Sequence, residues 1–183
     1  MRHFCKTNNL KYTLWASKEF DKTRVENELN KDGEHFHSAE VPPNIDKKNT
    51  FVVIRDPFMW YYSMYAFRRQ TKWTWNSNRA FDEKTRGHKS PTFTDWIQNV
   101  KQAYPSGFLN KLYKSYMHNA SYVFALENMY HKLTNLLKID SPVFPKAING
   151  ERHPIQTSNK DHNFIKDYEL EAYQLWDNVS RES

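Results

Sequence analysis

The clearest apolar run in the chain is Phe51 to Ile54 (FVVI), which is continuous and rich in β-branched residues. Such a run is typical of a central parallel strand that is buried on both faces. Asp56 and Pro57 come soon after it, and these residue types favour the N-cap and the first position of a helix. The pattern therefore predicts a strand that enters a helix, Phe58 to Arg69, through one tight turn.

A second apolar run, Tyr122 to Leu126, predicts another buried strand, and Glu127 to Leu137 continues as a helix. Phe108 to Tyr116 fits either a helix or an extended arm. Other segments with clear patterns are a short strand and two helices, at Lys11 to Ala16, Thr92 to Ala103 and Phe164 to Val179. Strands that alternate with helices indicate an α/β sheet.

Composition places the chain among globular proteins and changes the picture only slightly. Its 183 residues fit one domain, 1–183, and 38% are hydrophobic and 26% charged. Aromatic residues make up 16%, which lets a rather polar sequence build a core because each ring buries a large area. The net charge of +6 suits an anionic ligand such as a nucleic acid, a phosphorylated nucleotide or an acidic glycan, or simply a solvated basic surface.

Cysteine content and hydropathy exclude several classes of protein. Cys5 is the single cysteine, which excludes an internal disulfide framework and a cysteine-rich zinc site, and we expect no metal. No apolar run approaches the roughly 18 residues that span a bilayer. The first residues, MRHFCK, contain no apolar segment of the kind found in secretory signals. We therefore expect a cytoplasmic protein without a membrane span.

Two polar residues around the first strand could grip one phosphate. Open α/β sheets bind ligands beyond the carboxyl ends of their strands, where Arg55 is predicted to lie. Ser63 follows on the helix, on the same face as Asp56. A guanidinium gives planar, bidentate donation, and a helix start adds its dipole. The spacing alone equally allows Arg55 to pair with a carboxylate while Ser63 is an ordinary helical surface residue.

Phe51 to Phe67, FVVIRDPFMWYYSMYAF, resembles the 3'-phosphate-binding segment of sulfotransferases that use 3'-phosphoadenosine-5'-phosphosulfate (PAPS). That segment joins an apolar strand, an Arg, a turn with Asp and Pro, and a Ser eight residues after the Arg. The resemblance implies that Arg55 and Ser63 bind the 3'-phosphate. It also implies a three-layer α/β fold, related to P-loop proteins, with a mostly parallel central sheet and helices on both faces.

The same resemblance assigns roles elsewhere in the chain. EHFHSAEVPP stands where the family carries a histidine that acts as general base toward the acceptor hydroxyl; His37 fits best and His35 second, although either could be a loop residue. Leu126 stands where a tyrosine usually packs near adenine, so it gives at most an apolar contact. Arg152, in the late loop FPKAINGERHP, is a further candidate contact to the anionic ligand, or a solvated residue.

The family's pattern also predicts what the chain does. Sulfotransferases begin with a strand and a phosphosulfate-binding loop, and MRHFCKTNNLKY instead resembles the helix after that loop. We therefore expect an N-terminally truncated fold with impaired activity, unless the missing strand and loop lie upstream of a misassigned start. The predicted activity is sulfuryl transfer from PAPS to a hydroxyl acceptor, a carbohydrate or small molecule. The alternative is a non-catalytic binding module for a phosphorylated nucleotide or acidic glycan. Nucleic-acid binding through Trp73 and Trp75 ranks last, because the aromatic residues fall in core-like segments.

Overall fold

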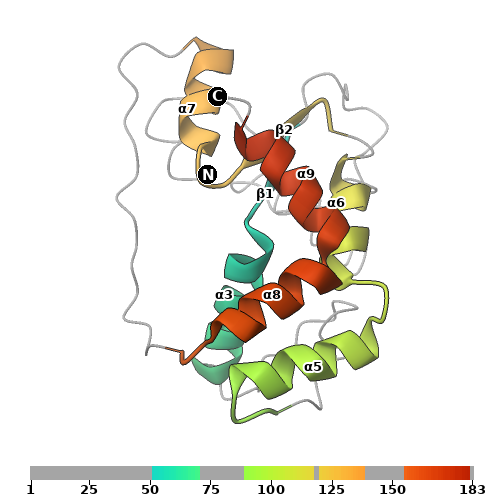
Figure 1. Ribbon diagram of the computed structural model, residues 1–183. Helices are drawn as coiled ribbons and strands as arrows, with labels where there is room; N and C mark the ends of the chain where they lie inside the picture. The colour runs from blue at the N-terminus through green and yellow to red at the C-terminus, as the bar shows by residue number, and fades with distance from the viewer. Residues whose placement is uncertain (1–50, 71–88, 118–119, 139–154, 182–183) are drawn as a thin grey trace, which may run out of the picture. The chain divides into compact units, whose positions relative to one another are not determined.

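The computed structural model of the protein describes residues 51–70, 89–117, 120–138 and 155–181 (Figure 1). These residues are mostly helical and include one sheet of two parallel strands, β1 (Phe51–Ile54) and β2 (Tyr122–Ala125). They belong to two compact units, with boundaries after Val53 and after Lys114. The predicted strands at 51–54 and 122–126 are thus confirmed, the second one residue shorter than expected.

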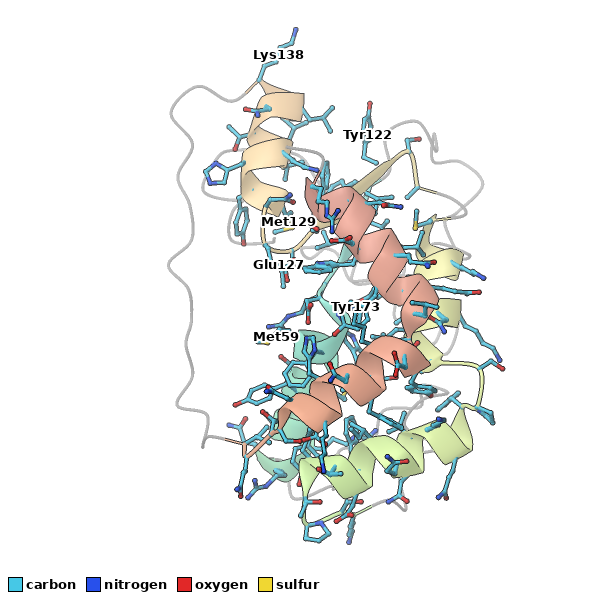
Figure 2. The ribbon with its side chains drawn as sticks, in the orientation of Figure 1. Met59, Tyr122, Glu127, Met129, Lys138 and Tyr173 are labelled. Atoms are coloured by element: carbon cyan, nitrogen blue, oxygen red, sulfur yellow. The ribbon has the colours of Figure 1, made fainter. Side chains whose placement is uncertain are left out.

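The first unit contains the paired strands and helix α7 (Met129–Leu137). Its core consists of three buried side chains and three partly buried ones that pack against them: Phe124, Met129 and Leu133, with Phe51, Val53 and Tyr130. The helix starts two residues later than predicted because a turn, closed by the Asn128 amide on the Ala125 carbonyl at 3.2 Å, separates it from β2. Figure 2 shows Lys138 at the end of α7, where its backbone is left-handed with φ 50°.

The second unit is helical. Within it α3 contacts α5, α8 and α9, and α8 also contacts α5 and α9. Residues of α6 up to Lys114 belong to the same unit. The bounds of the helices are α3 (Pro57–Gln70), α5 (Phe93–Ala103), α6 (Phe108–Met117), α8 (Asn159–Tyr168) and α9 (Leu170–Arg181). Phe108 to Tyr116, for which the sequence left two possibilities open, is therefore a helix.

Aromatic rings fill the centre of this second unit. Tyr61 and Tyr65 of α3 are fully buried, as is Trp96 of α5. The ring centroids of Tyr65 lie 5.5 Å from those of both Phe93 and Trp96, and Tyr61 lies 5.9 Å from Trp96. Edge-to-face and tilted ring pairs at these spacings are favourable beyond the area they bury. Aromatic rings thus build the core of this unit, as the high aromatic content of the sequence predicts.

The helix starts follow the local rules of capping. The Asp56 carboxylate accepts a hydrogen bond from the Met59 amide at 2.8 Å, which confirms Asp56 as the cap of α3. Thr92 caps α5 in the same way, with its hydroxyl accepting from the Asp95 amide at 3.1 Å. Both helices begin within one residue of the predicted start, because each cap depends on residues within one turn.

Two expectations about architecture need correction. The described residues do not form a three-layer sheet with helices on both faces; their sheet has two strands, and β1 is only half-buried over its first three residues. The predicted strand at 11–16 lies outside the described residues. The predicted single helix, Phe164 to Val179, is two helices that begin with the Ser158 capping box and break at Glu169. The Glu169 side chain is held by another helix, which a local pattern does not reveal.

Candidate functional site

Arg55 lies at the joint between β1 and α3, one residue beyond the strand and one before the capping Asp56. Its Nη1 donates a hydrogen bond to the Ser63 Oγ at 2.6 Å. Both residues are half-buried. The expected convergence of these two side chains is confirmed. Their role in binding a ligand stays a prediction.

The backbone of Arg55 is held by a residue far away in sequence. The Tyr113 hydroxyl, from α6, donates to the Arg55 carbonyl oxygen at 2.6 Å. The same hydroxyl lies 3.3 Å from the Arg55 amide nitrogen, which donates to it. The buried Tyr113 side chain thus gives a hydrogen-bond partner to both the amide and the carbonyl of Arg55.

Among the residues that the structure describes, no carboxylate forms an ion pair with Arg55, which was the alternative left open by the sequence. Within the described residues, ion pairs join Lys114 to Glu171 at 2.5 Å and Arg181 to Asp177 at 2.6 Å, and none involves Arg55. Its guanidinium instead meets a neutral hydroxyl.

The other predicted site residues lie outside the described residues or in the other compact unit. His37, His35 and Arg152 lie outside the described residues. Leu126 is 39% exposed in the turn after β2 and belongs to the first compact unit, whereas Arg55 and Ser63 belong to the second.

A contact beside Ser63 involves the residue that follows the late loop. The Ile155 amide donates to the Tyr62 hydroxyl of α3 at 3.4 Å.

A second polar cluster, which sequence reasoning missed, is centred on the buried Glu169 between α8 and α9. Its Oε1 accepts from the Tyr61 hydroxyl at 2.5 Å and from the amides of Phe108 and Leu109 at 2.8 and 3.1 Å. Its Oε2 accepts from the Asn110 amide at 2.9 Å. The carboxylate therefore binds the first three amides of α6, where the helix dipole favours a negative charge.

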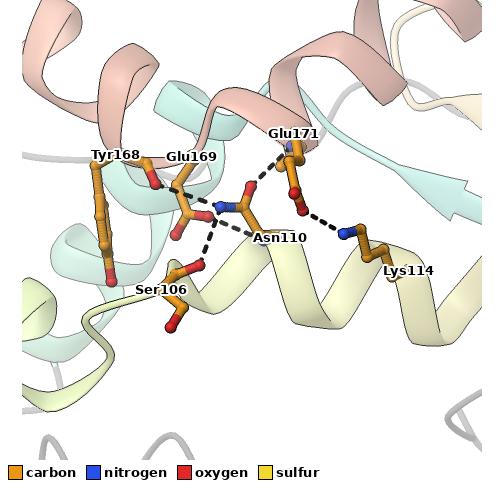
Figure 3. Close-up of polar contacts among 7 residues, drawn as sticks. Ser106, Asn110, Lys114, Tyr168, Glu169 and Glu171 are labelled. Atoms are coloured by element: carbon orange, nitrogen blue, oxygen red, sulfur yellow. Dashed lines mark hydrogen bonds and ion pairs between the residues drawn. The ribbon is translucent and has the colours of Figure 1, made fainter.

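Asn110 of α6 forms a hydrogen bond to the start of α9 (Figure 3). Its Oδ1 accepts from the Ala172 amide at 2.9 Å, and its Nδ2 donates to the Ser106 carbonyl at 3.1 Å. The two helix starts are thus capped reciprocally, each by a side chain from the other helix. Gly107 makes room for this, since a Cβ there would lie 2.3 Å from the Asn110 Nδ2, and its φ of +84° suits glycine.

Burial governs the protonation of this second cluster. It raises the pKa of the Glu169 carboxyl above its ordinary value, while hydrogen bonds from Tyr61 and the three α6 amides act in the opposite direction. Burial, followed by the nearby Glu169 carboxylate, also raises the pKa of Tyr61 and of Tyr168. The hydrogen bonds of the cluster join groups of the protein itself, namely the Glu169 carboxylate, the Asn110 side chain and nearby backbone groups, so the cluster serves structure.

One signal in the sequence could have revealed Glu169. Ile165, Tyr168 and Ala172 are buried along one stripe of the C-terminal helices, and Glu169 falls within that stripe. An acidic residue on an apolar face predicts a buried carboxylate with partners. No comparable local signal marks Tyr113, because its partner is 58 positions away.

No protein-family model, no curated protein and no solved structure matches the chain significantly. Within the described residues, no helix is long and apolar enough to cross a membrane, and no three His, Cys, Asp or Glu side chains are grouped to hold a metal ion.

Proposed function

We propose that this chain binds the 3'-phosphate of PAPS through Arg55 and Ser63 and transfers the sulfuryl group to a hydroxyl acceptor, a carbohydrate or a small molecule. The observation that carries the proposal is the 2.6 Å hydrogen bond between the Arg55 Nη1 and the Ser63 Oγ, made across a strand end and a helix.

The chemistry of the pair suits a phosphate monoester. Arginine offers several fixed N–H donors to phosphate oxygens, and the serine hydroxyl places a further hydrogen-bonding group beside them. The Met59 amide already donates to the Asp56 side chain. The phosphate is therefore proposed to bind to the side chains of Arg55 and Ser63 and not to this amide. The start of the 14-residue helix α3 adds a favourable dipole.

In the proposed reaction, a histidine removes the proton of the acceptor hydroxyl, with His37 as the base and His35 as the alternative. The acceptor oxygen forms a bond to sulfur, while the bond from sulfur to the oxygen of the 5'-phosphate breaks. That oxygen keeps the electron pair, and adenosine 3',5'-bisphosphate leaves. Arg152 and Leu126 are proposed as further nucleotide contacts.

The first experiment measures binding of adenosine 3',5'-bisphosphate to the full chain by calorimetry. Arg55→Ala is expected to weaken binding about a hundredfold, and Ser63→Ala about tenfold, because hydrogen bonds to a charged group are stronger than neutral ones. Arg181→Ala, which removes an exposed arginine from the same unit, is the matched control and leaves affinity unchanged. Unchanged affinity in Arg55→Ala would exclude this site.

A second experiment separates an enzyme from a binding module. Transfer of a radiolabelled sulfuryl group from PAPS is measured against a panel of carbohydrate and small hydroxyl acceptors. Transfer that His37→Ala lowers by about a hundredfold supports the base assignment, with His35→Ala as the matched control. Tight binding of the bisphosphate without transfer to any acceptor would favour the non-catalytic module instead.

A further inference from the structure

Arg55 occupies a position where regular secondary structure does not hold the backbone. β1 ends at Ile54, and the first hydrogen bonds of α3 are accepted by Asp56. A peptide between a strand and a helix retains torsional freedom unless another group fixes it, and ordering one residue costs on the order of 1–2 kcal/mol. Rotation at this joint would swing the long Arg55 side chain away from Ser63.

Tyr113 supplies the missing partners at this joint. Its hydroxyl donates to the Arg55 carbonyl at 2.6 Å and accepts from the Arg55 amide at 3.3 Å. The side chain of Tyr113 is 1% exposed, so the surrounding core fixes the place of its hydroxyl. Arg55 and Ser63 belong to the same compact unit as this part of α6.

We propose that Tyr113 is a positioning residue that sets the Arg55 backbone so that the guanidinium and the Ser63 hydroxyl meet on one phosphate. This inference rests on the proposed function of Arg55 and Ser63. Tyr113 acts through the Arg55 peptide and not through contact with the nucleotide. Its contribution is preorganisation, which improves affinity by removing part of the ordering cost from the binding step.

A residue that only stabilises the fold would weaken the binding of every ligand alike. The positioning role instead predicts a loss confined to the 3'-phosphate. The discriminating quantity is therefore the ratio of two dissociation constants, that of adenosine 5'-monophosphate divided by that of adenosine 3',5'-bisphosphate. The two ligands differ in the 3'-phosphate alone.

The experiment measures this ratio by calorimetry for the full chain, for Tyr113→Phe, for Arg55→Ala and for the double variant. Tyr113→Phe removes one hydroxyl and keeps the ring, and we expect about tenfold weaker binding of the bisphosphate with unchanged binding of the monophosphate. In the Arg55→Ala background, Tyr113→Phe has no further effect, because its action passes through Arg55.

Tyr168→Phe is the matched control. The Tyr168 hydroxyl also donates to a backbone carbonyl, that of Tyr104, at 2.6 Å, and it belongs to the same unit. Its loss removes a comparable hydrogen bond without touching the joint at Arg55. We expect the ratio of dissociation constants to stay at the wild-type value.

The outcomes separate this inference from the function on which it rests. If Arg55→Ala weakens bisphosphate binding while Tyr113→Phe leaves the ratio unchanged, or if the two losses add in the double variant, Tyr113 is not a positioning residue. If Arg55→Ala itself has no effect, the proposed site is wrong and the positioning role falls with it. Hydrogen exchange of the Arg55 amide in the wild type gives a second test, since fast exchange there would contradict a hold by Tyr113.

Discussion

Two helix starts in the second compact unit carry charged side chains of opposite sign. At the start of α6, the protein places its own anion, the buried Glu169 carboxylate, on three backbone amides. At the joint before α3, it places a cation, Arg55, next to a neutral hydroxyl, and no carboxylate of the described residues pairs with it. The first cluster is electrostatically complete. The second is the one that we propose binds an external anion.

The two polar clusters are expected to differ in what they contribute to the protein. A buried cluster whose donors all meet acceptors from the same chain contributes to stability, and removing one member leaves the others unsatisfied. The single hydrogen bond of the half-buried Arg55 contributes little to stability, and its proposed contribution is to ligand binding. Stability and affinity should therefore respond to different substitutions.

Glu169→Ala should have the largest effect on stability. It leaves the Tyr61 hydroxyl and three amides of α6 without their acceptor in the core, and we expect a loss of about 4 kcal/mol in the free energy of unfolding. Urea unfolding followed by tryptophan fluorescence measures it. The control is Glu171→Ala, whose exposed ion pair with Lys114 should be worth about 0–1 kcal/mol. Equal losses in both variants would refute the structural role of Glu169.

Gly107→Ala should come next, with a loss of about 3 kcal/mol. The new Cβ would lie 2.3 Å from the Asn110 Nδ2 and 2.5 Å from the Glu169 Oε2, and the φ of +84° is unfavourable for alanine. The added methyl group would displace the Asn110 and Glu169 side chains, and the backbone strain would add to the loss. Urea unfolding again gives the measurement, and Ser106→Ala, an exposed neighbour, serves as control. A loss below about 1 kcal/mol would mean that the cluster adapts to the methyl group.

Alkaline pH should weaken the same cluster through Tyr61. Its pKa is raised in the folded protein by burial and then by the Glu169 carboxylate, so above about pH 10 the unfolded chain loses this proton while the folded protein keeps it. Stability therefore falls as pH rises, by about 1.4 kcal/mol per pH unit for this one group. The difference in unfolding free energy between wild type and Tyr61→Phe, measured from pH 9 to 11, isolates it. A pH-independent difference would contradict the shift.

Arg55→Ala should have the smallest effect on stability, about 1 kcal/mol or less, since it removes one hydrogen bond from a half-buried pair. Its effect should appear with ligand. At a hundredfold excess over the dissociation constant, adenosine 3',5'-bisphosphate should stabilise the wild type by about 2.7 kcal/mol and should barely stabilise Arg55→Ala. Thermal unfolding with and without the bisphosphate measures both quantities. A variant that is strongly destabilised without ligand would make Arg55 structural, like Glu169.

Local patterns in the sequence predicted the elements whose determinants lie within a few residues. The strand at Phe51, its turn and the cap at Asp56 all appear as expected. So does α5, because Thr92 and the apolar spacing behind it act within one or two turns. The meeting of Arg55 and Ser63 belongs to this class too, since a strand, a tight turn and two helical turns fix their distance.

Local sequence patterns are therefore sufficient to predict a strand–turn–helix with an arginine and a serine in reach of one another, and composition indicates an aromatic core. The break of the last helix at Glu169 and the contact of Tyr113 with the Arg55 backbone depend on tertiary packing. The α6 amides lie 59 to 61 positions from Glu169, and Tyr113 lies 58 positions from Arg55. Contacts of such separation depend on how helices pack, and packing is set by the sum of many side chains rather than by any local period.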